Sequence, residues 1–163
     1  MNANAVTNTE PLADSVLGFR VGAWGFILPV SIHCEVLERL HVNPIPNVEP
    51  WLSGLLNVRG LIVPVIDLHL WLGMGTLATK ERRLFTIGRG DKTMAVWIDG
   101  YPQLLSEQAQ SFVPIPPVET LPPALLPFVA QCYSYHGEIW LKAQFDSLFR
   151  TLGQHQSRQE TVS

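Results

Sequence analysis

Arg59 is the side chain in this sequence best placed for recognition chemistry. It stands in an Arg-Gly pair between two apolar runs, one ending at Val58 and the next starting at Leu61. Gly60 can adopt the positive φ of a tight turn at no steric cost, so the pattern predicts a hairpin with Arg59 at its tip. A guanidinium there presents a rigid fork of donors to a docking partner. An arginine at a turn is also commonly just solvated, and both interpretations stay open.

Groups that could act in catalysis or bind a metal form no recognised pattern. Asp67 and His69 could be an acid–base pair, but Asp67 also precedes an apolar run at residues 68–72 and is expected to cap a helical turn there. The adjacent potential ligands at residues 33–35 would point to alternate faces of a strand, so they would not easily converge on one metal ion. No GxSxG, HExxH or P-loop motif occurs in the sequence. We expect no catalytic residue, no metal site and no cofactor.

Composition narrows the class of protein. Lys and Arg total 11 against 14 Asp and Glu, and this net charge of −3 argues against a nucleic-acid binder. Charged residues make up 15% of the chain, below the ~25% usual for soluble domains, and the mean hydropathy is +0.16. Either the core is large, or apolar surface is left for a partner. Cys34 and Cys132 show no CxxC spacing and are expected to be buried free thiols.

The two ends of the chain are polar. Residues 1–15 lack the basic and apolar regions of a signal peptide and are expected to be a disordered tail. No apolar run approaches the ~20 residues needed to cross a bilayer. We expect a cytoplasmic protein without direct membrane insertion. Its single ordered region spans residues 16–152, and a polar tail follows at residues 153–163.

Short apolar runs separated by glycine predict a mainly β fold. We expect a turn at residues 99–100, and prolines bar residues 106–128 from a sheet interior. Residues 34–40 suit a strand or a helical turn, and residues 49–53 a short helical turn. An apolar stripe predicts a helix over residues 142–152 that stops at Gly153. Strands are expected at residues 18–22, 25–30, 55–66 (a hairpin), 84–88, 93–98 and 132–141 (a last hairpin).

The two halves of the chain show a weak internal symmetry. Similar hairpins open at Phe19 and Phe85, and each is followed by a long proline-bearing connection. A second hairpin then turns at Gly60 or Gly137, and an apolar helical segment comes after it. Two small related β-barrels would explain this pattern.

Residues 54–68, GLLNVRGLIVPVIDL, resemble the signature of the CheW-like family of chemotaxis coupling proteins. In that family a Gly-apolar-apolar-Asn-apolar-Arg-Gly turn precedes an apolar-Pro-apolar-apolar-Asp-Leu strand. Residues 26–30, 44–46 and 96–100 are also similar to family positions, and the resemblance covers about residues 16–152. It implies two five-stranded SH3-like β-barrels, interleaved in sequence and packed on a shared core, with a short C-terminal helix.

The resemblance also implies a function without enzymatic activity. Members of the family couple the cytoplasmic tip of a membrane chemoreceptor to the CheW-like regulatory domain of a CheA-type sensor histidine kinase, and such domains can assemble into rings. The chain would then be cytoplasmic and recruited to membrane receptor arrays. Its unusual last turn, Tyr135-His136-Gly137 in place of Asp-Gly, leaves room for a specialised branch such as the type IV pilus systems that control twitching motility.

Carried over position by position, the resemblance assigns roles to six residues. Three match the receptor-facing region of the family and three match structural positions of the central hairpin. The receptor-binding candidates are Glu35, Asn57 and Arg59, and the structural candidates are Gly54, Gly60 and Asp67. The main alternative is an SH3-like peptide-binding module outside chemosensory signalling, which would need an exposed aromatic groove built from Trp24, Trp51 or Trp71.

Overall fold

The computed structural model describes residues 16–74, 81–105 and 111–162, with helical side chains described as far as residue 154. The disordered tail expected at residues 1–15 lies outside the described residues. The chain divides into two compact units, each built from two separate stretches of sequence. The first unit comprises residues 1–31 and 102–144, and the second comprises residues 32–101 and 145–163.

The first unit contains five described strands in one continuous pairing order. Antiparallel pairs join β1 to β2, β10 to β9 and β9 to β8, while β2 and β10 run parallel. Pro114 lies in the three-residue β8 at the edge of the order, where a missing amide donor is tolerated. The strands are β1 (Val16–Val21), β2 (Trp24–Pro29), β8 (Val113–Ile115), β9 (Val129–Tyr135) and β10 (Glu138–Ala143).

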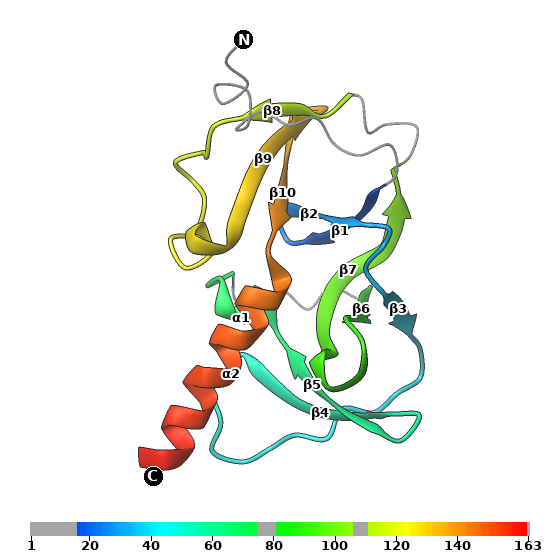
Figure 1. The fold of residues 1–163 in the computed structure, drawn as a ribbon, viewed down its shortest axis with the longest axis vertical. Helices are drawn as coiled ribbons and strands as arrows, with labels where there is room; N and C mark the ends of the chain where they lie inside the picture. Colours follow the sequence, from blue (N-terminus) through cyan, green and yellow to red (C-terminus); the bar gives the residue numbers. More distant parts are fainter. Residues whose placement is uncertain (1–15, 75–80, 106–110, 163) are drawn as a thin grey trace. The chain divides into compact units, whose positions relative to one another are not determined.

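The second unit repeats this plan with five described strands and two α-helices (Figure 1). Antiparallel pairs join β4 to β5, β6 to β7 and β3 to β6, while β5 and β7 run parallel. Strand β7 continues past Tyr101, so its last three residues belong to the second stretch of the first unit, which starts at Pro102. The elements are β3 (Cys34–Leu37), β4 (Leu52–Val58), β5 (Leu61–Ile66), α1 (Leu68–Trp71), β6 (Arg82–Ile87), the 3-10 turn η2 (Gly90–Lys92), β7 (Met94–Leu104) and α2 (Phe145–Val162). A further 3-10 turn, η4 (Leu126–Phe128), belongs to the first unit.

The internal symmetry expected from the sequence is present in the backbone. Each unit contains two hairpins, and the second strands of the two hairpins pair in parallel. In the second unit β5 of the hairpin β4–β5 pairs with β7 of the hairpin β6–β7. In the first unit β10 of the hairpin β9–β10 pairs with β2 of the hairpin β1–β2. The Asp67 amide donates to the Trp51 carbonyl at 2.7 Å, and the Gln144 amide donates to the Phe128 carbonyl at 2.7 Å, at the same spacing along the chain. Each unit is therefore a five-stranded SH3-like barrel, and the mainly β fold is confirmed.

Alternation along the strands gives each unit its own core. In the second unit Leu56 and Val58 of β4 and Val63 and Val65 of β5 are buried, while Asn57 and Ile62 between them face outward. This period of two is what a strand with one covered face requires. In the first unit the core cluster consists of Val16, Ile27, Leu105, Phe112, Tyr133 and Trp140.

The C-terminal helix differs from the prediction at both ends. Lys142 belongs to β10, α2 begins at Phe145, and the helix continues through Gly153 to Val162 for 18 residues. The predicted start of the helix at residue 142 and its predicted stop at Gly153 were therefore wrong. A glycine inside a helix costs only about 1 kcal/mol, and Gly153 has open space around its Cα, so nothing forces the helix to end there.

Two other local predictions are also revised, and one that was left open is decided. Asp99 and Gly100 do not turn the chain, because both lie within β7. Gly100 takes a φ of +69°, and its amide still donates to the Glu81 carbonyl at 2.9 Å. At residues 49–53 the expected helical turn is replaced by a single turn, in which the Leu52 amide donates to the Glu49 carbonyl, and by the start of β4 at Leu52. The ambiguous residues 34–40 contain a strand, β3, because β6 supplies a pairing partner.

Gly54 and Gly153 make a matched pair for testing the close approach on β4. Gly54 has a φ of +146°, and a Cβ there would overlap the carbonyl group of Asn43, which is bridged to Leu55 by two 2.9 Å hydrogen bonds. We expect Gly54→Ala to lower the free energy of unfolding by roughly 2 kcal/mol or more. Gly153→Ala should raise it by about 1 kcal/mol. Urea denaturation measures both, and equal stability of the Gly54→Ala variant and the wild type would refute the close approach.

Candidate functional site

The turn between β4 and β5 holds Arg59 at the hairpin tip, as the sequence predicts. Val58 pairs with Leu61, so the loop has two residues, and both take positive φ: +51° for Arg59 and +87° for Gly60. These angles fit a type I′ turn, whose twist suits a hairpin. Asn57 Oδ1 accepts a hydrogen bond from the Gly60 amide at 2.9 Å and steadies the turn. Positive φ is unfavourable for a residue with a Cβ, so Arg59 occupies a strained position that points to a role for its side chain.

Glu35 on β3 meets Arg59 in an ion pair. Arg59 Nη2 pairs with Glu35 Oε1, and Arg59 Nη1 lies 3.4 Å from Glu35 Oε2, so the guanidinium fork faces the carboxylate with both donors. The hydrogen bond from Arg59 lowers the pKa of Glu35 below its usual value, and the same bond raises the pKa of Arg59. The Arg59 side chain is 71% exposed, and pairs this exposed contribute little to stability. The pair serves mainly to orient Arg59.

A hollow of about 340 Å³ lies beside this ion pair, lined in part by His33, Thr86 and Arg89. On the outer face of the hairpin Asn57 stands opposite Ile62, which is 57% exposed. The tip therefore combines a fixed charged fork, polar groups and one apolar side chain open to solvent. This composition suits a protein contact better than a small-molecule pocket, because the charged fork and Ile62 are exposed at the surface of the tip.

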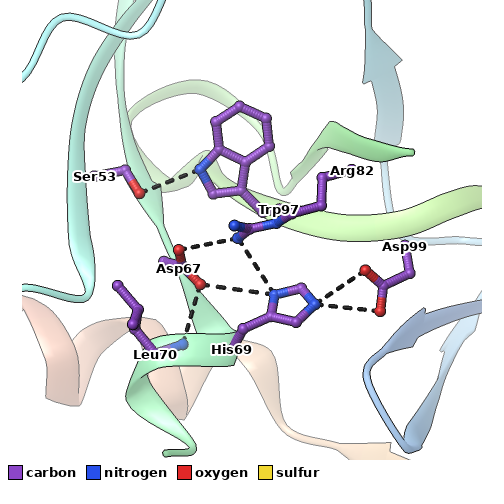
Figure 2. A network of polar contacts seen from close by, with 7 residues as sticks. All are labelled: Ser53, Asp67, His69, Leu70, Arg82, Trp97 and Asp99. Carbon is purple, nitrogen blue, oxygen red and sulfur yellow. Dashed lines mark hydrogen bonds and ion pairs between the residues drawn. The ribbon is translucent and has the colours of Figure 1, made fainter. Parts of the chain in front are cut away.

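The far end of the hairpin is anchored by a buried polar network (Figure 2). Asp67, directly after β5, is the N-cap of α1, and its Oδ1 accepts from the Leu70 amide at 3.1 Å. Its Oδ2 lies 2.9 Å from Nη2 of Arg82 on β6. Burial alone would raise the pKa of Asp67, but hydrogen bonds from His69, Arg82 and Leu70 outweigh it and bring that pKa to about 2. Asp67 is therefore ionised and tied to two elements.

His69 extends the network to β7. Its Nε2 lies 3.1 and 3.2 Å from the two carboxylate oxygens of Asp99, and its Nδ1 lies 3.6 Å from Asp67 Oδ1 and 3.3 Å from Arg82 Nη2. Burial lowers the pKa of His69, but the two carboxylates outweigh burial and raise it above the usual value. Asp67 and His69 are 4% and 2% exposed, so the pair is closed to substrate and holds the structure together.

Sequence reasoning found the residues of the tip and missed most of the anchor. Glu35, Asn57 and Arg59 lie together around one turn, and Gly54, Gly60 and Asp67 shape the hairpin behind it. Arg82, Asp99, Trp97 and Ser53 were not predicted. Trp97 Nε1 donates to Ser53 Oγ at 3.2 Å and joins β7 to β4. These four residues have no local signal, because each acquires its partner only when β6 and β7 pair beside the hairpin.

The remaining candidate groups give no second site of this kind. Among residues 16–74, 81–105 and 111–162, no three His, Cys, Asp or Glu side chains gather closely enough to hold a metal ion. Within the same residues, no helix combines the length and apolar character that crossing a membrane requires. Cys34 and Cys132 are free thiols, and Cys132 is buried as expected, but Cys34 is only half-buried.

Two five-stranded barrels, with an arginine at one hairpin tip paired to a carboxylate on β3, characterise this protein. Residues 15–152 match the description of the CheW-like domain. The chain belongs to the CheW-like family.

Named relatives agree with that assignment. The chain is 31% identical to Protein PilI of Pseudomonas aeruginosa over 117 residues, which cover 71% of this chain and 64% of that protein's length. It is 21% identical to Chemotaxis protein CheW of Rhizobium meliloti over 116 residues, covering 71% and 75% of the two chains. The crystal structure of scaffolding protein TtCheW from Thermoanaerobacter tengcongensis is similar in fold, with a TM-score of 0.64, 23% identity, and coverage of 83% and 90%.

The raised pKa of His69 predicts a pH dependence of stability. Protonated His69 between Asp67 and Asp99 stabilises the fold fully below its unfolded pKa of 6.5, and this contribution is lost as pH rises through the higher folded pKa. We expect the free energy of unfolding to fall over that window in the wild type and to stay flat in the His69→Gln variant. His41→Gln, at an exposed position, leaves the network intact and should follow the wild type. Denaturant titrations across the window measure this, and parallel curves for wild type and His69→Gln would contradict it.

Proposed function

We propose that this chain is a non-enzymatic adaptor that couples the cytoplasmic tip of a membrane chemoreceptor to the regulatory domain of a CheA-type histidine kinase. Membership of the CheW-like family supports an adaptor role. The observation that carries the proposal is Arg59, which is exposed, stands on a strained two-residue turn and is oriented by its ion pair with Glu35. Strained backbone positions cluster at functional sites, so the strain at Arg59 supports a binding role for its side chain.

The receptor contact consists of Glu35, Asn57 and Arg59. Arg59 can keep one edge of its fork on Glu35 while it offers further donors to carbonyl or carboxylate oxygens of the receptor. Ile62 adds apolar area next to the charged group, and Asn57 holds the turn that carries both. An interface of ordinary size, on the order of 1,200 to 2,000 Å² in total, would extend well beyond these residues.

The kinase contact uses other surface, because an adaptor must hold both partners at once. The kinase domain expected here is itself CheW-like, so strand-edge pairing between barrels, and from it ring assembly, would place the chain in membrane-bound receptor arrays while it remains cytoplasmic. The likeness to Protein PilI supports an output in type IV pilus signalling and twitching motility. The likeness to a chemotaxis protein supports the same coupling role in chemotaxis.

The peptide-module alternative receives no support from the tryptophans. Trp24 is 8% exposed and therefore buried, and Trp51 and Trp71 are half-buried. An aromatic groove for proline-rich segments needs open ring faces. None of the three tryptophans is exposed, so the adaptor function is retained as the proposal.

Replacing Arg59 tests the receptor contact. We expect Arg59→Ala to bind a purified receptor cytoplasmic fragment at least roughly tenfold more weakly than the wild type, because a central arginine of a protein interface is a typical hot spot. The melting temperature should stay close to that of the wild type, since the side chain is exposed and adds little to stability. Isothermal titration calorimetry with the receptor fragment gives the affinity.

Arg150→Ala is the matched control, because Arg150 is an exposed arginine on α2, away from the hairpin tip. It should bind the receptor fragment like the wild type. Unchanged affinity of the Arg59→Ala variant would remove the receptor contact from the tip. Equal losses in the Arg59→Ala and Arg150→Ala variants would show that only overall charge matters.

A further inference from the structure

A second hollow in the second unit is rich in arginine. Its volume is about 420 Å³. Three arginines line it, Arg39, Arg82 and Arg83, and Glu38 supplies the one carboxylate among the described lining residues. Arg82 and Arg83 come from β6, and Glu38 and Arg39 directly follow β3. The chain as a whole carries a net charge of −3, so this cluster has the opposite sign to the rest of the molecule.

Two of these guanidinium groups lie over aromatic rings. Arg83 Cζ lies 3.9 Å from the ring centroid of Tyr101, and Arg82 Cζ lies 5.2 Å from that of Trp97. A cation–π contact restrains a guanidinium over the ring and leaves its N–H groups for acceptors. The two forks are therefore oriented before any ligand arrives, which reduces the entropy lost on binding.

The donors on these forks outnumber the acceptors near them. Arg82 uses Nη2 on Asp67, but Nε of Arg82 and Nε of Arg83 are buried and have no hydrogen-bond partner in the part of the chain that the structure describes. Arg83 Nη1 is 3.9 Å from Glu38 Oε1, beyond hydrogen-bond distance. That oxygen accepts instead from the Tyr101 hydroxyl at 2.7 Å. Buried donors without acceptors are costly, so the cluster is short of negative charge.

Arg39 adds a charge that has no ion-pair partner among the described residues. It is exposed, has a φ of +60°, and makes no ion pair with any residue in the described ranges. Leu40 and Tyr101 beside it are 39% and 54% exposed. Arginine next to an accessible tyrosine, with apolar surface around it, is the composition found at the centre of protein interfaces.

We propose that this hollow binds the carboxylate side chains of an acidic segment of a partner protein. The carboxylates would take the free edges of Arg83 and Arg39, and the aliphatic part of the segment would lie against Leu40 and Tyr101. Glu38 is an internal competitor, since its carboxylate already stands at 3.9 Å from Arg83. The partner must displace Glu38 or share Arg83 with it. The lining of this site includes none of Glu35, Asn57 or Arg59. The proposal can therefore be tested independently of the proposed receptor contact.

Titration of the full-length chain with a blocked hexaglutamate peptide tests this site, with blocked hexaglutamine as the uncharged control. Nuclear magnetic resonance spectra should show saturable shifts of the Trp97 indole and of the Arg83 backbone amide with hexaglutamate alone. Arg83→Gln and Arg39→Gln should each weaken binding roughly tenfold, as expected for loss of a charge-assisted hydrogen bond. Glu38→Gln should tighten it, because the internal competitor is gone. Arg150→Gln on α2 should leave it unchanged.

The increase in affinity on Glu38→Gln is the sharpest result, because a general effect of net charge would also make Arg150→Gln weaken binding. Melting temperatures of all variants show whether each is folded. Absence of saturable hexaglutamate binding to the wild type, or weaker binding by a folded Glu38→Gln variant, would overturn the proposal. So would saturation of the Arg83 amide shift by inorganic phosphate with no response to hexaglutamate, since the ligand would then be a phosphate.

Discussion

The ionised carboxylate of Asp67 is the constraint on which the second unit depends. It lies at the end of β5, where the chain turns into α1, and it meets Leu70, Arg82 and His69 in a buried place. A buried charge is tolerated only when its partners are supplied. The hairpin, α1 and β6 must therefore come together for Asp67 to be satisfied, and Asp99 adds β7 through His69.

This anchor explains why the opposite end of the hairpin can carry a strained turn. β4 and β5 are held at one end by the network and along their length by buried Leu56, Val58, Val63 and Val65. The exposed ion pair at the tip then has only to aim Arg59. Under the proposed function, stability and recognition are divided between the two ends of one hairpin, and we expect a change at the tip to alter binding while the fold persists.

Sequence patterns could predict what depends on neighbours along the chain. Gly60 predicted the hairpin turn, Asp67 predicted the helix cap, and the alternation of apolar residues predicted the inner face of β4 and β5. Each of these signals depends only on residues that are close in sequence. The partners of Asp67 and His69 could not be predicted, since Arg82 and Asp99 approach only through strand pairing. The predicted helix end at Gly153 was wrong for a related reason. The free-energy cost of one glycine in a helix is small beside the stabilisation from the buried stripe of Phe145, Leu148 and Leu152, so the helix continues.

The most direct test of an adaptor is the formation of a three-component complex. Sedimentation velocity would be measured for the full-length chain mixed with a receptor cytoplasmic fragment and a CheA-type kinase regulatory domain. The account predicts one faster-sedimenting species that contains all three, and its dissociation into a chain–kinase pair and free receptor fragment when Arg59→Ala replaces the wild type. Mutually exclusive binding of the two partners to the wild-type chain would contradict the account, because an adaptor has to hold both at once.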